Sequence, residues 1–128
     1  MEVLLDSSFV ISCIKKKIDF LDELEKLGFK VLLPREVLQE LKDLKNESYH
    51  PDRVAIDVAL ELFEKRKVKK ITLGKKPVDL GLIEMGKKGV YIATLDNAIR
   101  RSVPNKVIIS EQKNNVCLLY TSPSPRDS

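Results

Sequence analysis

Two carboxylates follow two apolar segments of this 128-residue chain. Asp6 comes directly after Val3-Leu4-Leu5, and Asp96 follows Ile92-Ala93-Thr94 with only Leu95 between them. Short apolar runs of this kind predict buried strands, and the carboxyl ends of parallel strands meet at one edge of a sheet. If the two strands are neighbours, the two side chains can share one cation. Each residue also has an ordinary alternative, because Asp is a favoured N-cap at the start of a helix.

A third carboxylate, Asp79, opens a nearly apolar helical segment. Helical spacing puts it between Leu82 and Ile83, so we expect its side chain to face the apolar interior. A charge there needs a partner, and no Lys or Arg precedes Lys87 in that helix. The alternative is a first-turn Asp after Pro77 that is favoured by the helix dipole.

A fourth carboxylate, Glu40, lies at the edge of the apolar stripe of the helix predicted over 35–45, and Glu36 lies further from that stripe. An ordinary solvated Glu is the alternative for either residue. Taken together, four acids can face one end of the sheet: Asp6, Glu40, Asp79 and Asp96. Oxygen ligands without sulfur or imidazole suit Mg²⁺ or Mn²⁺, and such ions activate water and stabilise the charge that develops in phosphodiester cleavage.

The elements that must position these acids alternate along the chain. Apolar runs predict strands over 2–5, 30–33, 68–73, 90–94 and 106–110. Helical spacing predicts helices over 7–17, 19–27, 35–45, 52–65, 78–85 and 96–101. Alternating strands and helices imply right-handed crossovers and an α/β fold with a parallel sheet covered on both faces.

Composition limits the class of protein. A chain of 128 residues with 43% hydrophobic and 33% charged residues is expected to fold as one compact domain. Two cysteines and one histidine exclude a disulfide framework and a four-ligand zinc site. No apolar run approaches the roughly 20 residues of a membrane span and no signal peptide is evident, so we expect a cytoplasmic protein without a membrane partner. The net charge of +4 admits a polyanionic partner.

The last residues differ in amino-acid composition from the rest of the chain. From Cys117 to Asp127 the sequence resembles the translation of a transposon adapter used for sequencing libraries. A segment of that origin is not part of the natural protein and is left out when the fold is predicted. We therefore predict a domain over 1–116, a non-native segment over 117–128, and a natural C-terminus that is missing. The alternative is a natural tail rich in Ser and Pro.

The ordered set of acids resembles the PIN domain family of small metal-dependent ribonucleases. The resemblance covers Met1 to about Ser110. Its four motifs are Val3-Leu4-Leu5-Asp6-Ser7-Ser8, Pro34-Arg35-Glu36-Val37-Leu38-Gln39-Glu40-Leu41, Val78-Asp79-Leu80-Gly81-Leu82-Ile83-Glu84-Met85 and Ile92-Ala93-Thr94-Leu95-Asp96-Asn97. Two departures are Leu95, where a polar residue is common, and the absence of a second acid beside Asp79.

The resemblance implies a three-layer α/β/α sandwich with a central parallel sheet, in which the first and fourth strands are adjacent. It implies that the four acids form the catalytic and metal-binding quartet for Mg²⁺ or Mn²⁺, with Ser7 and Thr94 as supporting hydroxyls. The implied activity is that of an endoribonuclease acting on RNA. Two roles stay open: a VapC-type toxin with an antitoxin partner, and a nuclease that processes ribosomal RNA. A homodimer is typical of the family.

Basic residues cluster at the ends of segments, where ordinary solvated side chains are the alternative to RNA contacts. Arg100 and Arg101 are best placed for phosphate contacts, because they follow Asp96 in the same predicted helix. Two other classes compete with an enzyme. One is a PIN-like module that binds RNA or protein without cleaving, and the other is a phosphoacceptor receiver domain. The receiver is disfavoured because Ser7 follows Asp6 where a second carboxylate is needed.

Overall fold

The computed structural model describes residues 1–47, 51–110 and 115–120, with the backbone alone for 115 and 117–120. Its strands are β1 (Glu2–Leu5), β2 (Lys30–Pro34), β3 (Lys69–Ile71), β4 (Tyr91–Ala93), β5 (Asn105–Ser110) and β6 (Asn115–Tyr120). Its helices are α1 (Ser7–Lys15), α2 (Phe20–Lys26), α3 (Arg35–Lys45), α4 (Arg53–Lys65), α5 (Val78–Lys87) and α6 (Asn97–Ser102). Strands and helices therefore alternate as predicted, with ends that differ by a few residues.

The strands form one sheet in the order β3-β2-β1-β4-β5-β6. The first five strands are parallel, and β6 alone runs antiparallel to its neighbour β5. The register pairs Leu5 of β1 with Ala93 of β4. The first and fourth strands are thus adjacent, as the resemblance implied, and strand order reverses between them.

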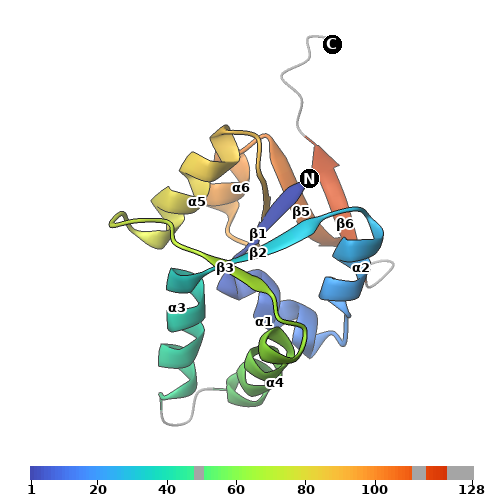
Figure 1. Cartoon of the computed structure of the whole chain (residues 1–128), viewed down its shortest axis with the longest axis vertical. Coiled ribbons are helices and arrows are strands. Elements are labelled where there is room, and N and C mark those ends of the chain that lie inside the picture. The colour runs from blue at the N-terminus through green and yellow to red at the C-terminus, as the bar shows by residue number, and fades with distance from the viewer. Residues whose placement is uncertain (48–50, 111–114, 121–128) are drawn as a thin grey trace.

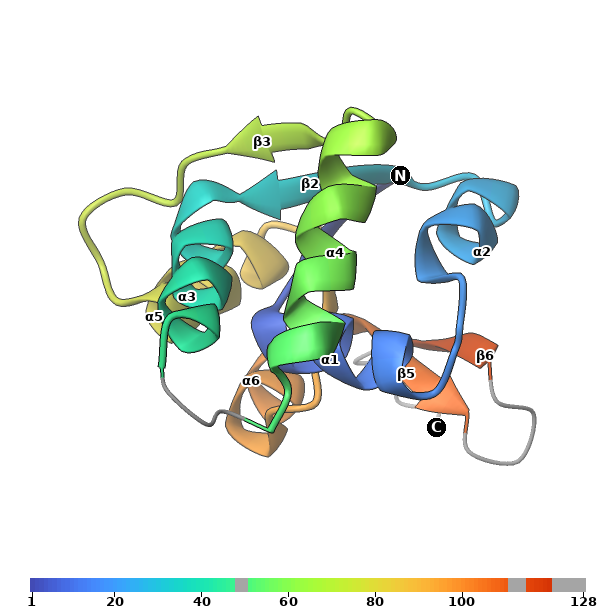
Figure 2. The same cartoon turned by 90° about the horizontal axis from the view of Figure 1, so that it is seen from below.

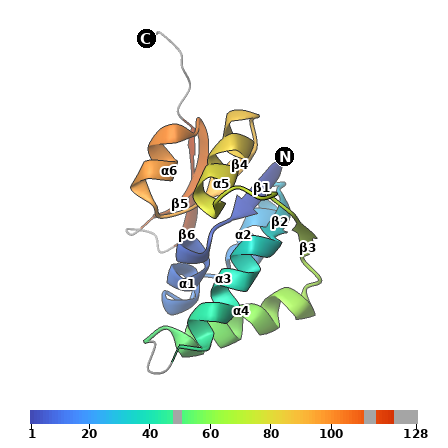
Figure 3. The ribbon, with the colours of Figure 1, turned by 90° about the vertical axis from the view of Figure 1, so that its left-hand side faces the viewer.

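Helices cover both faces of the sheet (Figures 1 and 3). Helices α1 to α4 lie on one face over a large core that includes Phe9, Phe20 and Phe63. Helices α5 and α6 lie on the other face over a smaller core that includes Leu82 and Ile99. Figure 2 shows α4 beside α3, consistent with their packing contacts. The predicted three-layer α/β/α sandwich is confirmed.

Two of the acids that end strands also start helices. The side chain of Asp6 accepts a hydrogen bond from the Ser7 N–H at the start of α1, and that of Asp96 accepts one from the Ile99 N–H at the start of α6. An N-cap carboxylate satisfies backbone donors that the first helical turn leaves without partners. The N-cap alternative is therefore true of both residues, and it holds each backbone at the end of its strand.

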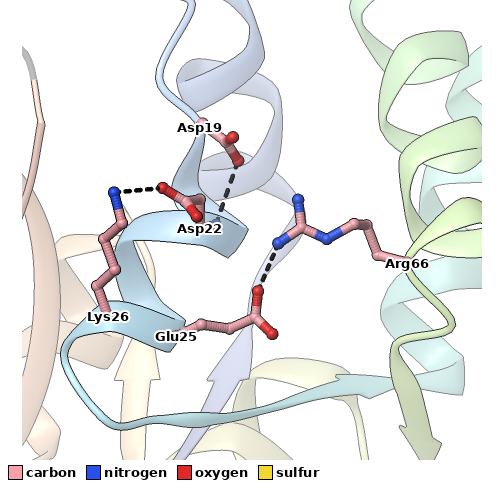
Figure 4. Close-up of polar contacts among 5 residues, drawn as sticks. All are labelled: Asp19, Asp22, Glu25, Lys26 and Arg66. Carbon is pink, nitrogen blue, oxygen red and sulfur yellow. Dashed lines mark hydrogen bonds and ion pairs between the residues drawn. The ribbon is translucent and has the colours of Figure 1, made fainter.

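The end of the sheet away from these caps carries ion pairs on the short helix α2 (Figure 4). Lys26 pairs with Asp22 within the helix at 3.0 Å, and Arg66, which ends α4, pairs with Glu25. The Asp19 side chain caps the helix by accepting from the Asp22 N–H. These contacts connect α2 to the end of α4. In the described ranges, none of the helices has the length and hydrophobicity needed to span a bilayer.

The C-terminal part of the sheet differs from the expectation. The strand predicted over 106–110 as the last one is β5, but a further strand, β6, pairs with it from Ser110 opposite Asn115 to Asn105 opposite Tyr120. Main-chain pairing at an exposed edge requires no particular side chains, so any short apolar segment at this position can extend the sheet. Residues 121–128 lie outside the described residues, and the predicted boundary after residue 116 stays a prediction.

Candidate active site

A pocket of about 480 Å³ opens beyond the carboxyl ends of β1 and β4. It is lined by Asp6, Ser7, Ser8, Glu40, Val78, Asp79, Leu95, Asp96 and Ile99. The four acids singled out in the sequence therefore border one cavity, although they come from four separate segments of the chain. Every charged residue in this lining is a carboxylate. Such a pocket attracts cations, and it repels anions until a bound cation offsets the negative charge of the carboxylates.

Asp6 is the most enclosed of the four acids, with only 8% of its surface exposed. Its Oδ1 accepts from the Ser7 N–H at 2.9 Å, and its Oδ2 accepts from the Thr94 hydroxyl at 2.6 Å and the Ser8 hydroxyl at 3.3 Å. The backbone N–H of Asp6 donates to the Ala93 carbonyl at 2.9 Å across the β1–β4 pair. Asp6 is thus held rigidly at the junction of the two strands.

Glu40 enters the pocket from α3, and the Ser7 hydroxyl donates to its Oε1. Ser7 therefore joins the start of α1 to the middle of α3, two elements that are 33 residues apart. Glu40 is exposed, so its carboxylate remains open to the pocket. The supporting role of Ser7 toward a metal stays a prediction.

Asp96 and Thr94 form the other wall of the pocket. The Asp96 N–H donates to the Thr94 hydroxyl oxygen at 3.0 Å, and Asp96 Oδ1 accepts from the Ile99 N–H at 3.1 Å. Thr94 is fully buried, and its single hydroxyl both donates to Asp6 and accepts from the backbone of Asp96. This hydroxyl fixes the two strand-end acids relative to each other.

Asp79 lies in the pocket lining, but the expectation that it faces the apolar interior is wrong. It is exposed, and Leu80 beside it is 52% exposed. Helix α5 buries Gly81, Leu82 and Gly86, and Val78 in its first turn packs against the core, whereas the adjacent Asp79 is left exposed at the pocket. The helical spacing located the apolar stripe but could not show where along the helix the core ends.

Two residues that the sequence did not assign to the site make polar contacts in or near it. Ser8 donates to Asp6 and accepts from the Leu95 N–H at 3.3 Å, so it bridges the two strand ends. Glu36 of α3 accepts from the N–H groups of Leu73 and Gly74, at 3.1 and 3.3 Å, in the segment that leads to α5. The signal for Ser8 was its place in the first motif. Nothing local in the sequence indicated the long-range partners of Glu36.

The donor set of the pocket fits a hydrated Mg²⁺ or Mn²⁺. Among the described residues, no three His, Cys, Asp or Glu side chains lie close enough together to enclose a metal ion directly. Mg²⁺ usually keeps several waters and uses only one or two protein carboxylates, so acids spaced around an open cavity suit it. The ion pairs between described residues involve none of these four acids. Their negative charge is therefore available to a cation.

Arg100 and Arg101 belong to α6 but not to the lining of this pocket. They line a second cavity together with Asn97 and Lys106. The helix therefore separates an acidic cavity from a basic one, with Asp96 and Ile99 on the first and Asn97, Arg100 and Arg101 on the second.

Comparison with known proteins is consistent with the fold. The family model described as a PIN like domain matches residues 3–111. The solved structure of the PIN domain endonuclease Utp24 is similar, with a TM-score of 0.69 and 20% identity over 93% of this chain and 92% of that one. At that identity the likeness supports the fold alone. No curated protein matches the chain. Because the family match spans most of the residues, this chain belongs to the PIN-like domain family.

Proposed function

We propose that this protein is an endoribonuclease that hydrolyses RNA phosphodiester bonds with Mg²⁺ or Mn²⁺. The observation that carries the proposal is the single pocket bordered by Asp6, Glu40, Asp79 and Asp96 without a basic residue in its lining. Four carboxylates around one cavity favour divalent cations, and a cation is needed before a phosphate can approach them. When bound, such an ion supplies an activated water and offsets the charge that builds on the phosphate during cleavage.

The chain's own contribution is to hold the acids in place. Thr94 and Ser8 donate to one oxygen of Asp6, so that carboxylate cannot rotate freely. Ser7 orients Glu40, and the N-cap hydrogen bond orients Asp96. Asp79 is exposed at the pocket mouth and is free of such contacts with other side chains in the described residues. We infer that the carboxylates of Asp6, Glu40 and Asp96 are held in one orientation by hydrogen bonds, whereas the carboxylate of Asp79 can change its orientation when a ligand binds.

The experiment that tests this function measures cleavage of a structured RNA by the wild type, Asp6→Asn and Asp96→Asn. Mg²⁺ or Mn²⁺ should support cleavage by the wild type, chelator should abolish it, and each variant should lose activity by about 100-fold or more, in line with loss of a metal-assisted step. Exposed Asp43→Asn on α3 is the matched control and should cleave normally. Undiminished cleavage by both variants would show that Asp6 and Asp96 are not catalytic residues.

The same assay separates the proposed enzyme from a non-catalytic module. A wild type that binds RNA but does not cleave it with either metal would indicate the module. Toxin and ribosomal-RNA-processing roles separate in cells, because a VapC-type toxin arrests growth when it is expressed without its antitoxin. The antitoxin, the homodimer and the cytoplasmic location stay predictions from the sequence.

A further inference from the structure

A second cavity, of about 270 Å³, lies beside the acidic pocket and is lined by other residues of α6. Its lining consists of Asn97, Arg100, Arg101 and Lys106. This lining contains three cations, one amide and no carboxylate. We call it the basic pocket.

The basic pocket is built by two elements. Asn97, Arg100 and Arg101 share one face of α6 because residues three and four apart are neighbours on a helix. Lys106 belongs to β5 beneath that helix and is only 6% exposed. Its Nζ donates to the backbone carbonyl of Arg100, and Nε of Arg101 donates to the carbonyl of Asn97 at 3.3 Å. The helix and the strand therefore hold the cations in a defined arrangement.

The positive charge of this pocket is not balanced by the surrounding protein. The ion pairs between described residues include none of Arg100, Arg101 and Lys106. Burial lowers the pKa of Lys106, and the neighbouring charge of Arg100 lowers it further. Like charges this close repel one another in a partly buried site. An anion bound between them would relieve that repulsion.

The opposite flank of the acidic pocket has a different charge balance. There a cavity runs along α1 and shares Ser7 and Ser8 with the acidic pocket. Its Lys15 is paired with Asp52 at 2.8 Å. The α6 flank is therefore the one where grouped positive charge lies beside the acids without an ion-pair partner in the described chain.

We propose that the basic pocket binds a backbone phosphate of the RNA, next to the phosphate that is cleaved in the acidic pocket. The two cavities adjoin each other on the surface of α6, because Asp96 in one lining and Arg100 in the other are four residues apart and therefore neighbours on the helix. A guanidinium group can donate two parallel hydrogen bonds to the oxygens of one phosphate. Such a contact fixes the position of the RNA strand without reading its base sequence. This inference rests on the proposed function, because it assigns the substrate of the acidic pocket to RNA.

The test compares RNA binding by the wild type and by Arg100→Gln/Arg101→Gln. The probe is a fluorescein-labelled single-stranded RNA of about 15 nucleotides, near the upper limit for one small domain. Binding is followed by anisotropy in Ca²⁺, which supplies a divalent cation to the acidic pocket, and cleavage is followed separately with Mn²⁺. The matched control is Lys87→Gln/Lys88→Gln, which removes the same charge from two exposed residues at the far end of α5.

We expect the arginine variant to raise Kd by about 10-fold, corresponding to one lost phosphate contact, and to reduce the salt dependence of log Kd by about 0.7. The lysine control should change Kd by about twofold or less, since salt screens the attraction between RNA and exposed charges that make no direct contact with it. Arg100→Lys/Arg101→Lys should recover part of the affinity, because it keeps the charge and loses the paired geometry. Lys106→Met should weaken binding in the same direction, with circular dichroism to verify that it folds.

The outcomes separate the two proposals. If the wild type binds and cleaves RNA while the arginine variant matches the lysine control, the phosphate site is wrong and the nuclease function stands. A wild type that neither binds nor cleaves RNA overturns both. A loss of RNA affinity that is confined to the arginine and Lys106 variants supports the phosphate site, whether or not these variants also cleave RNA more slowly in Mn²⁺.

Discussion

The hydroxyl of Thr94 donates a 2.6 Å hydrogen bond to Oδ2 of Asp6, and these residues stand 88 positions apart in the chain. The bond joins the end of β4 to the end of β1, two parallel strands that lie side by side where the strand order reverses. Thr94 is fully buried, so its hydroxyl has no water to replace this partner. The geometry of the acidic pocket depends on this contact.

Replacing Thr94 by Val should damage both stability and activity. Val keeps the shape but removes the donor to Asp6 and the acceptor for the Asp96 N–H. We expect a loss of about 1–3 kcal/mol in the free energy of unfolding, the usual cost of leaving buried polar groups without partners. RNA cleavage should fall further than the folded fraction does. Thr94→Ser keeps the hydroxyl and is the control, and equal activity of the Val and Ser variants would contradict the assigned role.

Glu36 should act on the site through the segment that precedes α5. Its carboxylate accepts from the backbone N–H groups of Leu73 and Gly74. Glu36→Gln replaces one of the acceptor oxygens by a donor, so we expect a loss of about 1.5 kcal/mol, the lower end of the range for hydrogen bonds to charged groups because one acceptor oxygen remains. Urea unfolding measures it. Exposed Glu61→Gln on α4 is the control, and an equal change in both variants would argue against a specific role.

Gly86 of α5 should resist substitution although it is helical. A Cβ at this position would lie 2.8 Å from Cβ of Val103 and 3.1 Å from Cγ1 of Ile92. Ala usually stabilises a helix relative to Gly by about 1 kcal/mol, but overpacking costs about 1–3 kcal/mol, so we expect a net loss in Gly86→Ala. A double-mutant cycle with Val103→Ala checks the cause. The combined variant should be less destabilised than the sum of the single ones, and strict additivity would exclude the clash.

Cys13 should be an unreactive thiol. It is fully buried, and burial, with a smaller contribution from Glu23, raises its pKa from 9.0 to about 12. The thiolate is the reactive form, so thiol reagents at pH 8 should label Cys13 only after unfolding, measured in a Cys117→Ser background. Rapid labelling in the folded protein would contradict this.

The same residue predicts a pH dependence of stability. Between pH 9 and about pH 12 the unfolded chain loses the Cys13 proton while the folded chain keeps it. The contribution of the thiol is therefore complete below pH 9 and is lost as pH rises, by up to about 1.4 kcal/mol per pH unit. Urea unfolding at several pH values should show a steeper decline for the wild type than for Cys13→Ala. Parallel curves would contradict the burial argument.

The C-terminal segment gives a prediction about the gene. The coding sequence from an independent clone should diverge after Val116 if residues 117–128 derive from an adapter. A chain that ends at Val116 should still unfold cooperatively, because Val116 is buried and its N–H donates to Glu23 at 2.8 Å, whereas the later residues of β6 add only an edge strand. An unchanged sequence in the second clone would show that the segment is natural.

Much of the fold could be predicted from local patterns. The helix expected over 35–45 has these bounds, and the strand expected over 2–5 does too. Polar residues at the ends of apolar runs indicated where the caps lie, and Asp6 and Asp96 are both N-caps. These features depend on residues within a few positions of one another, so the sequence alone contains them.

The composition of the acidic pocket was also predictable, but its geometry was not. The ordered motifs indicated four acids, and all four border the same cavity. Their role as metal ligands stays a prediction. The direction of Asp79 was wrong, because a helical pattern does not show where the neighbouring layer ends. The partners of Glu36 and the burial of Lys106 involve contacts across 37 residues and between a helix and a strand.

The sequence by itself determined the order of strands and helices and the acids at their ends, since periodicity and capping act locally. Only the tertiary structure decided that α6 separates an acidic cavity from a basic one. The physical reason is that strand adjacency and side-chain burial arise from packing between distant segments. Asp96 and Arg100 are four residues apart in the sequence, but packing places them in the linings of two different cavities.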